Sequence, residues 1–254
     1  MQNNTNLTLS QYSKFAPYYK AIGEKRGHFD AQTMFLKNIL KCHSSESYTI
    51  LDASCGTGNV LLNLSEIFPN YKLFGTDGCP EFVLQANRLV GSKSINIQCT
   101  EWLNLRNVFE PNKFDLIYIL GNSIGHASSI NEFSQILSII KTLLKDGGSF
   151  IFDLRTWSDC DNNKSFNEPY IKENFIYLTN LKYTTEYYFK NRRHYLVHRI
   201  YNGDKLVTEI KLSFFAYSRQ EIDDIIISNG FYILERAHKP QDYPFLSYKI
   251  RKCK

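Results

Sequence analysis

A short apolar run ends in an acidic, glycine-rich turn at Leu51-Asp52-Ala53-Ser54-Cys55-Gly56-Thr57-Gly58, and a helical pattern begins directly after it. Glycine has no Cβ, so the backbone of such a turn can bend sharply and approach a bound molecule closely. In open α/β sheets, ligands bind at this place, outside the carboxyl ends of the strands. The segment therefore predicts an α/β fold with a ligand site beside Gly56 and Gly58.

Short apolar runs alternate with helical patterns from residue 48 onward. The runs are β-branched or aromatic and are bounded by Gly, Asp or Asn, at residues 48–53, 72–77, 95–100, 114–120 and 149–154. Helices with one apolar face are expected at residues 59–68, 81–89 and 131–144. This alternation is typical of the βαβ units that build a parallel sheet.

The pattern changes after residue 154. Residues 174–217 are rich in Tyr, Phe, Ile, Val and Thr and contain the hairpin dipeptide Asn202-Gly203, which together predict an antiparallel meander. Ser218-Arg219-Gln220-Glu221 predicts a capping box that opens a helix, and residues 231–235 are expected to be the last strand. Residues 29–41 predict a helix, and residues 12–27 an arm over the carboxyl edge of the sheet.

These segments divide the chain into three predicted parts. Residues 1–47 form an N-terminal arm and helix that cover the site, residues 48–154 and 208–254 form the sheet domain, and residues 155–207 form a β-rich substrate lid. A chain of 254 residues has room for one such domain with an insertion, rather than for two average domains.

Composition narrows the classes of function. The net charge of +5 is scattered along the chain, so no nucleic-acid partner is expected. The sequence has no secretory-leader pattern, no apolar run that could span a membrane, and six cysteines without a C-x-x-C pair or zinc-like spacing. We predict a cytoplasmic protein that binds no metal and no membrane.

Two acids accompany the turn. Asp52 precedes Gly56, and Leu61 stands where a dinucleotide motif has its third glycine, so both positions disfavour NAD. Asp77 ends the second predicted strand, where an acid commonly accepts hydrogen bonds from both ribose hydroxyls; the alternative is that Asp77 only caps the next helix.

In this order, the turn and the second acid resemble motifs one and two of the class I S-adenosyl-L-methionine (SAM) methyltransferases. The resemblance implies SAM as cofactor, S-adenosyl-L-homocysteine (SAH) as product, and a Rossmann-like, mostly parallel seven-stranded sheet with helices on both faces and a β-meander lid. From this part of the chain, the residues implied to bind SAM are Asp52, Ala53, Ser54, Gly56, Gly58, Asp77 and Gly78.

Further segments resemble the glycine N-methyltransferases and the glycine/sarcosine N-methyltransferases. They are Tyr19-Lys20-Ala21-Ile22-Gly23-Glu24 with Arg26, Glu101-Trp102-Leu103, and Leu120-Gly121-Asn122-Ser123-Ile124-Gly125-His126, which resembles the family's L-G-N-S-x-x-H motif. In that family the arginine grips the methionine carboxylate of SAM and the tryptophan packs beside the adenine. The resemblance therefore adds Tyr19, Arg26, Glu101, Trp102 and Leu120 to the expected cofactor site.

The same resemblance implies an acceptor site. Arg155 stands where the family's arginine pairs with the carboxylate of the amino-acid substrate, and Tyr177 is the candidate from the meander. Asn122 and His126 could accept hydrogen bonds from the acceptor amine, and His126 could also accept its proton. The catalytic candidates are therefore Asn122, His126, Arg155 and Tyr177.

Departures from the family near the acceptor leave the substrate open, since Ile124-Gly125 replaces Phe-Ala and Leu154 replaces His. We predict in-line methyl transfer to the amine of a small molecule, either an amino acid such as glycine or sarcosine or an amine intermediate of a natural product. The alternative is O- or C-methylation of a phenol or sugar. An RNA methyltransferase and a non-catalytic SAM-binding protein are disfavoured, and the family suggests a homo-oligomer.

Overall fold

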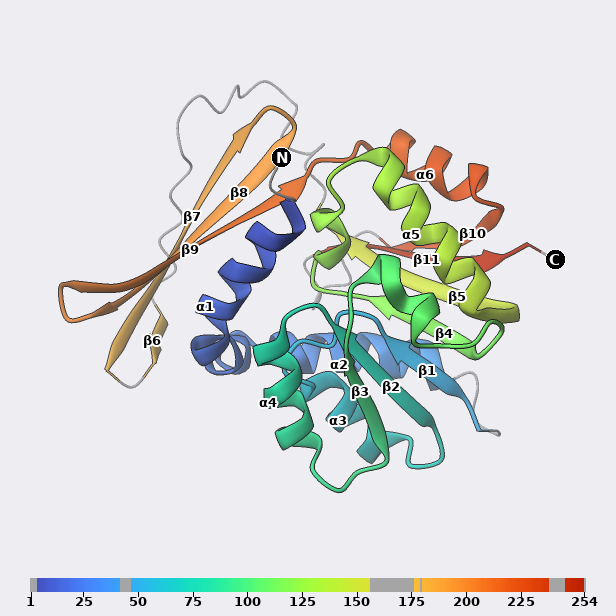
Figure 1. The fold of residues 1–254 in the computed structure, drawn as a ribbon, viewed down its shortest axis with the longest axis horizontal. Coiled ribbons are helices and arrows are strands. Elements are labelled where there is room, and N and C mark those ends of the chain that lie inside the picture. The colour runs from blue at the N-terminus through green and yellow to red at the C-terminus, as the bar shows by residue number, and fades with distance from the viewer. Residues whose placement is uncertain (1–3, 42–46, 156–175, 179, 238–244, 254) are drawn as a thin grey trace.

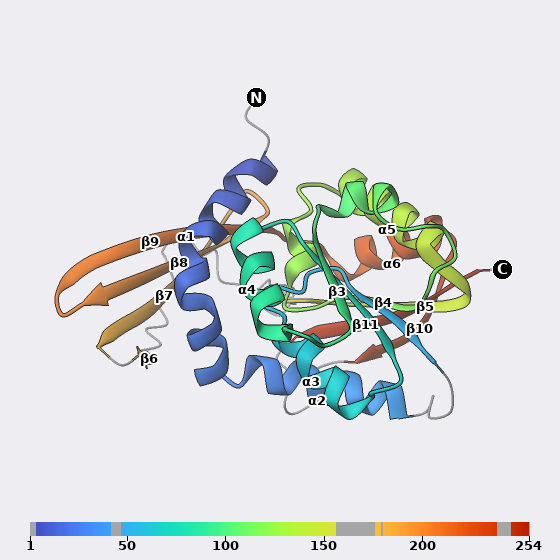
Figure 2. The same cartoon turned by 60° about the horizontal axis from the view of Figure 1, so that its bottom comes forward.

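The computed structural model describes residues 4–41, 47–155, 176–178, 180–237 and 245–253. They form two β-sheets, which we call sheet A and sheet B, and six α-helices (Figure 1). Sheet A with its flanking helices makes up the larger part of the described chain, and sheet B lies to one side of it with helix α1 (Asn4–Lys25) between the two (Figure 2).

Sheet A contains β1 (Thr49–Asp52), β2 (Lys72–Asp77), β3 (Ile95–Cys99), β4 (Phe114–Ile119), β5 (Leu144–Leu154), β10 (Phe231–Ala237) and β11 (Leu246–Lys252). Their order is β10-β11-β5-β4-β1-β2-β3, and β11 runs antiparallel to both of its neighbours while β1 to β5 pair in parallel. The predicted Rossmann-like, mostly parallel seven-stranded sheet is confirmed.

Helices cover both faces of sheet A. One face carries α2 (His28–Leu40), α3 (Asn59–Ile67) and α4 (Pro80–Val90), and the other carries α5 (Ile130–Leu143), α6 (Arg219–Ser228) and the short helix η2 (Trp102–Asn107). Strand β5 shows why both faces are needed: Phe150 and Phe152 pack toward α5, and Ile151 packs toward α2 and α3. A strand with apolar side chains on both faces is stable only between two helical layers.

Sheet B is an antiparallel meander of β6 (Ile176–Leu178), β7 (Leu181–Lys190), β8 (Arg193–Asn202) and β9 (Lys205–Phe215). The predicted meander is confirmed, and a hairpin is present at Asn202-Gly203, with Gly203 and Asp204 as its two turn residues. Strand β9 continues to Phe215, past the boundary predicted at residue 207. The strand extends this far because its pairing with β8 continues up to the residue pair Arg193 and Phe215.

The structure makes one prediction about the ends of the chain more specific and shows another to be wrong. Residues 12–25 of the expected arm are helical, as part of α1, which buries Phe15 and Ile22 against sheet B and Ala16 against Phe82. Residues 231–235 are not in the last strand, because β11 follows and inserts between β10 and β5. Its lysines and arginine make the sequence of β11 polar, yet Tyr248 and Ile250 are fully buried.

The turn after β1 depends on two glycines in left-handed backbone conformation, Gly56 with φ 52° and Gly58 with φ 80°. A Cβ on Gly58 would lie 3.0 Å from the Cβ of Ala86 and 3.2 Å from its Cα, on helix α4. A Cβ on Gly56 would meet Tyr19 only at 3.5 Å, an ordinary contact. Gly58 is therefore required by close packing of the turn on α4 as well as by its backbone conformation.

These two glycines make a matched test of the turn. Gly56→Ala should lower the free energy of unfolding by about 1–2 kcal/mol, the cost of placing an L-residue in left-handed conformation. Gly58→Ala should lower it by about 2–5 kcal/mol, because overpacking against Ala86 adds about 1–3 kcal/mol. Urea denaturation of the cofactor-free protein measures both. Equal losses would contradict the assigned contact between Gly58 and α4.

Candidate active site

Three cavities lie at the carboxyl edge of sheet A and share part of their lining. The first, here the loop cavity, has a volume of about 140 Å³ and is lined by the turn after β1, the ends of β2 and β3, and α1. The second, here the arginine cavity, has a volume of about 120 Å³ and lies between α1, α2, the end of β5 and sheet B. The third, here the narrow cavity, lies over the end of β1. Tyr19 and Ser123 line all three.

Two buried carboxylates hold the turn after β1. Asp77 accepts hydrogen bonds from the backbone N–H of Gly56 and of Cys79, both at 2.9 Å, and Asp52 accepts one from Ser54 at 3.0 Å. Burial raises the pKa of the Asp77 carboxyl to about 6, and the N–H groups partly oppose this shift. Burial, with a smaller contribution from the nearby Asp77, raises the pKa of Asp52 to about 7. A bound group that donates hydrogen bonds to these oxygens would therefore favour their charged forms.

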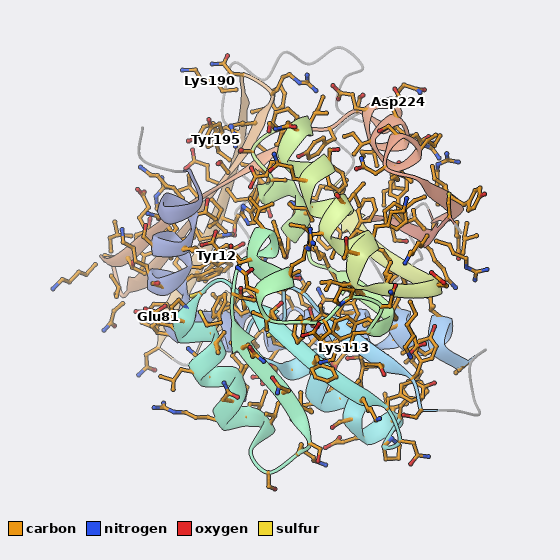
Figure 3. All side chains as sticks on the ribbon, turned by 45° about the vertical axis from the view of Figure 1, so that its right-hand side comes forward. Tyr12, Glu81, Lys113, Lys190, Tyr195 and Asp224 are labelled. Atoms are coloured by element: carbon orange, nitrogen blue, oxygen red, sulfur yellow. The ribbon has the colours of Figure 1, made fainter. Side chains whose placement is uncertain are left out.

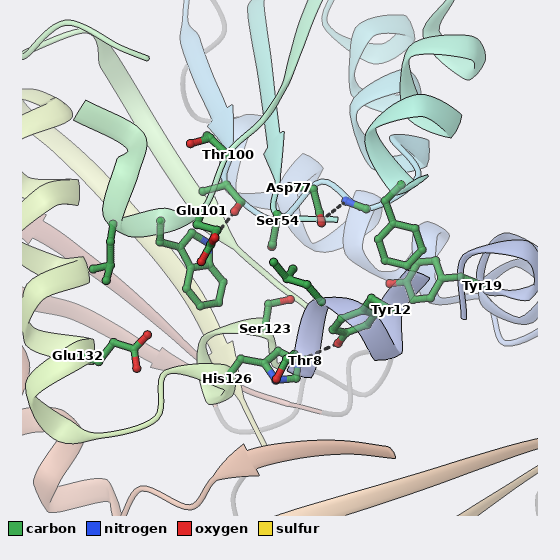
Figure 4. A pocket seen from close by; sticks show the side chains of 17 residues that line it. Thr8, Tyr12, Tyr19, Ser54, Asp77, Thr100, Glu101, Ser123, His126 and Glu132 are labelled. Carbon is green, nitrogen blue, oxygen red and sulfur yellow. Dashed lines mark hydrogen bonds between the residues drawn. The ribbon is translucent and has the colours of Figure 1, made fainter. Parts of the chain in front are cut away.

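Trp102 and Phe82 form the aromatic part of the loop cavity. The indole N–H of Trp102 donates to the backbone carbonyl of Ala53 at 2.7 Å, so the ring is fixed against the turn (Figure 4). Glu101 precedes Trp102 and lines the same cavity. This arrangement offers a flat apolar wall with polar groups at its rim, which suits a nucleobase with an attached ribose.

Tyr12 and His126 form a hydrogen-bonded pair at the boundary of the loop and arginine cavities. The Tyr12 hydroxyl lies 2.7 Å from Nε2 of His126, and Nδ1 of His126 lies 3.1 Å from the backbone carbonyl of Ser213 on β9 (Figure 4). A carbonyl only accepts, so Nδ1 carries the hydrogen and Nε2 accepts from the Tyr12 O–H. Burial lowers the pKa of His126 to about 4, which keeps the ring neutral.

The arginine cavity brings Arg26 and Arg155 to one site. The Arg155 guanidinium lies 5.4 Å from the ring centres of both Tyr187 and Phe245, and Arg26 lies 5.1 Å from that of Tyr183. Aromatic faces stabilise a guanidinium through cation–π contact. No acidic side chain lines this cavity among the described residues, so the site suits an anion.

Backbone contacts fix the end of β5 beside this cavity. The Asn122 side-chain oxygen accepts the backbone N–H of Arg155 at 2.9 Å, and Asp153 accepts the backbone N–H groups of Gly121 and Asn122 at 3.0 and 2.6 Å. Asn122, with φ 64°, begins the short helix η3 (Ser123–His126). The oxygen that we expected to face an amine is thus already engaged in positioning Arg155.

Most of the site residues predicted from the sequence are divided among the three cavities, and Tyr19 lines all of them. The loop cavity contains Tyr19, Ala53, Ser54, Gly56, Asp77, Gly78, Glu101, Trp102 and His126. The narrow cavity contains Asp52 and Leu120, and the arginine cavity contains Arg26, Asn122 and Arg155. Gly58 lines none of them and supports the turn from behind. Tyr177 lies on β6, but its side chain is outside the described residues.

Sequence reasoning missed three residues that the fold brings to the site. Tyr12 bonds to His126 from α1, Asp153 holds the loop after β4, and His198 on β8 lines the arginine cavity. Asp153 could have been found, since it ends a strand next to Arg155 as Asp77 ends β2. No sequence pattern marked Tyr12 or His198 in this way. They lie on α1 and in sheet B, which reach the site only through tertiary packing.

Comparison with known proteins agrees with this geometry. Residues 50–148 match the model of a family described as a methyltransferase domain. A curated protein of Geobacillus sp. that carries a methyltransferase name is 24% identical over 152 residues, which are 59% of this chain and 60% of that protein. The match thus spans less than two thirds of the relative's length.

Solved structures share the whole fold. An S-adenosylmethionine-dependent methyltransferase from Clostridium acetobutylicum has a TM-score of 0.73 at 19% identity, covering 96% of this chain and 99% of its own. CalS10, an amino pentose methyltransferase from Micromonospora echinaspora solved with SAM bound, has a TM-score of 0.73 at 13% identity over 92% of this chain and 96% of its own. The sugar N-methyltransferase KedS8 from Streptoalloteichus has a TM-score of 0.69 at 16% identity, covering 93% of both chains.

CalS10 was solved with SAM bound, and the residues that line the loop and narrow cavities of this chain fit the same molecule. The Ser54 hydroxyl is buried without a hydrogen-bond partner among the described residues and lines both cavities. Asp77 and Asp52 offer acceptors, and Trp102 offers an apolar face. No cluster of His, Cys, Asp or Glu suited to a metal ion occurs within the described ranges. The described helices include none that is long and apolar enough to cross a membrane.

The role expected of Asp77 can be measured by SAH binding. Asp77→Asn should weaken SAH binding by about 1–3 kcal/mol, because a charged hydrogen-bond partner is lost. Because the pKa of Asp77 is raised to about 6, wild-type affinity should increase from about pH 5 to about pH 8, and the variant should show a smaller increase. Isothermal titration calorimetry measures both effects.

Asp224→Asn is the matched control. Asp224 is exposed on α6 and lies on another side of the protein from Tyr12 (Figure 3). This variant should bind SAH as the wild type does. Unchanged SAH affinity in Asp77→Asn would remove Asp77 from the cofactor site.

Proposed function

Because its domain and fold are those of the class I SAM-dependent methyltransferases, we propose that this chain methylates the amine of a small molecule that also carries an anionic group. SAM supplies an electrophilic methyl group on a sulfonium when it is bound. The observation that carries the proposal is the position of Tyr12, whose hydroxyl bonds to His126 at the boundary between the loop cavity and the cationic arginine cavity. An amino acid and an amino sugar with an acidic substituent both belong to this substrate class.

Tyr12 and His126 orient the amine in this proposal. Since the Tyr12 O–H donates to Nε2 of His126, the lone pairs of the Tyr12 oxygen are left to face the cavities. They can accept an N–H of the amine and so direct its nitrogen lone pair toward the methyl donor. Tyr12 is then the contact residue, and His126 positions it. Catalysis by orientation needs no nucleophilic side chain.

The arginines favour the reactive form of the amine. An amine attacks a methyl group only when it is unprotonated, and a positive charge close to Arg26 and Arg155 is repelled. The same two arginines help to lower the pKa of the neighbouring His198 to about 3, where burial is the largest cause. An ammonium ion bound in this cavity would lose its proton more readily for the same reason.

Arg155 would hold the anionic group of the acceptor. Its guanidinium lies 5.4 Å from the ring centres of Tyr187 and of Phe245, and its backbone is fixed by Asn122. A planar guanidinium binds a carboxylate through two parallel hydrogen bonds, so it would set the distance between the anion and the amine. The resemblance to glycine and sarcosine N-methyltransferases supports a carboxylate, and the amino pentose methyltransferase and the sugar N-methyltransferase among the structural neighbours support a larger amine.

The test of this function is SAH release over matched pairs of acceptors. Each pair joins an amine with an anionic group to the same amine without it, such as glycine and methylamine, and the panel includes sarcosine, amino sugars, a phenol and a neutral sugar. We expect turnover with anionic amines, and slower or no turnover with their neutral partners. Preferred turnover of the phenol or the neutral sugar would contradict N-methylation.

Arg155→Lys tests the anion contact directly. The variant should raise KM for the anionic acceptor about tenfold or more, because a single ammonium cannot reproduce a two-point contact, while SAH affinity stays unchanged. Steady-state kinetics and calorimetry separate the two quantities. An unchanged KM, or an equal loss with the acceptor that lacks the anion, would exclude the proposed role of Arg155.

A further inference from the structure

A chain of buried polar groups lies under the arginine cavity, in sheet B. Nδ1 of His198 is 2.7 Å from the Tyr183 hydroxyl and 3.1 Å from the Thr185 hydroxyl. Tyr183 and Thr185 are on β7, and all three side chains are almost completely buried. The function outlined above uses none of these three groups.

The hydrogen bonds determine which nitrogen of His198 carries the hydrogen. If Nδ1 were protonated, its hydrogen would be shared between two hydroxyl oxygens, and the buried hydroxyl hydrogens of Tyr183 and Thr185 would have to find other acceptors. If Nδ1 is unprotonated, its single lone pair accepts the Tyr183 hydrogen at a short distance, and only the Thr185 hydrogen needs another acceptor. Burial, together with Arg26 and Arg155, keeps the ring neutral, so Nε2 carries the hydrogen.

The His198 ring is held rigidly at the cavity wall. It stacks on Phe15 of α1, with ring centres 5.0 Å apart and planes at 17°, and on Tyr183, with ring centres 5.5 Å apart and planes at 22°. His198, Arg26 and Arg155 all line the arginine cavity. With Nδ1 engaged below the cavity, Nε2–H is the remaining polar group of the ring.

We propose that His198 determines acceptor specificity, by donating its Nε2–H to the same anionic group that Arg155 binds. This inference rests on the proposed function. A neutral donor next to a guanidinium recognises oxygen that bears negative charge without adding a second full charge, and it gives nothing to an ammonium. The buried hydroxyl of Tyr183 fixes the ring as a donor, and thereby sets the chemistry of the acceptor.

Kinetics test this assignment with two phenylalanine variants on one strand. His198→Phe keeps the stacked ring and removes the N–H, and His194→Phe is the matched control, since His194 is buried on β8 outside the cavity lining. We expect His198→Phe to raise KM for the anionic acceptor about tenfold, with kcat and SAH affinity close to wild type. The control should keep the wild-type KM. An unchanged KM in His198→Phe, or an equal rise with the acceptor that lacks the anion, would overturn the assignment.

Nitrogen-15 NMR of the histidine rings tests the same assignment in the wild-type protein, without turnover. His198, identified by its absence in His198→Phe or by sequential assignment, should be the neutral Nε2–H form, and acetate added to the SAH complex should shift its Nε2 resonance. The Nδ1–H form, or an Nε2 resonance that acetate leaves unchanged, would overturn the proposal. If no acceptor in the panel is methylated, the proposed function fails while the acetate titration still decides the role of His198.

Discussion

Buried carboxylates that accept backbone N–H groups hold the whole carboxyl edge of sheet A in place. Asp52, Asp77 and Asp153 each lie at or next to the end of a strand, and each binds the backbone of a loop that forms the cavities. Asp77 joins the turn after β1 to the segment after β2, and Asp153 joins the loop after β4 to the end of β5. Loops that are anchored in this way keep their shape without a bound ligand, which is the condition for orienting small reactants.

Burial of the two carboxylates beside the loop and narrow cavities, Asp52 and Asp77, lowers the stability of the folded protein. Burial raises the folded-state pKa of Asp77 to about 6 and of Asp52 to about 7, above the ordinary carboxyl value. For such groups the folded state binds protons more tightly than the unfolded state, so the protein loses stability as the pH rises from about 4 to about 7. A ligand that donates hydrogen bonds to these carboxylates would recover part of that loss.

The fold and the cofactor side of the site could be predicted from the sequence because their signals are local. The strand that ends at Asp52, the glycines after it and the acid that ends β2 lie within one βαβ unit, and βαβ geometry brings them together. Strand β11 was missed because its buried residues Tyr248 and Ile250 alternate with Lys249 and Arg251. Tyr12 and His198 come from α1 and sheet B, whose packing against the site no local pattern encodes, whereas Arg155 was predicted through the family resemblance.

The acceptor side also changed the assignment of individual residues. Asn122 and His126 were expected to meet the amine directly, and each lines a cavity. The structure adds a second contact for each, because the Asn122 oxygen binds the Arg155 backbone and Nε2 of His126 is bonded to the Tyr12 hydroxyl. Both motif residues hold another side chain in place. The motif after β4 is thus a support for residues that other parts of the chain contribute.

The hydrogen bond from Nδ1 of His126 to the backbone carbonyl of Ser213 links the loop after β4 to strand β9 of sheet B. Ser213 belongs to β9, so the tautomer of a histidine in η3, after strand β4 of sheet A, depends on a strand of sheet B. A shift of β9 would release Nδ1, let the ring rotate or change tautomer, and turn the Tyr12 hydroxyl from a donor into an acceptor. Substitutions that destabilise sheet B far from the cavities would then lower kcat, because they disturb the Tyr12 hydroxyl that orients the amine. KM for the acceptor could stay unchanged in the same variants.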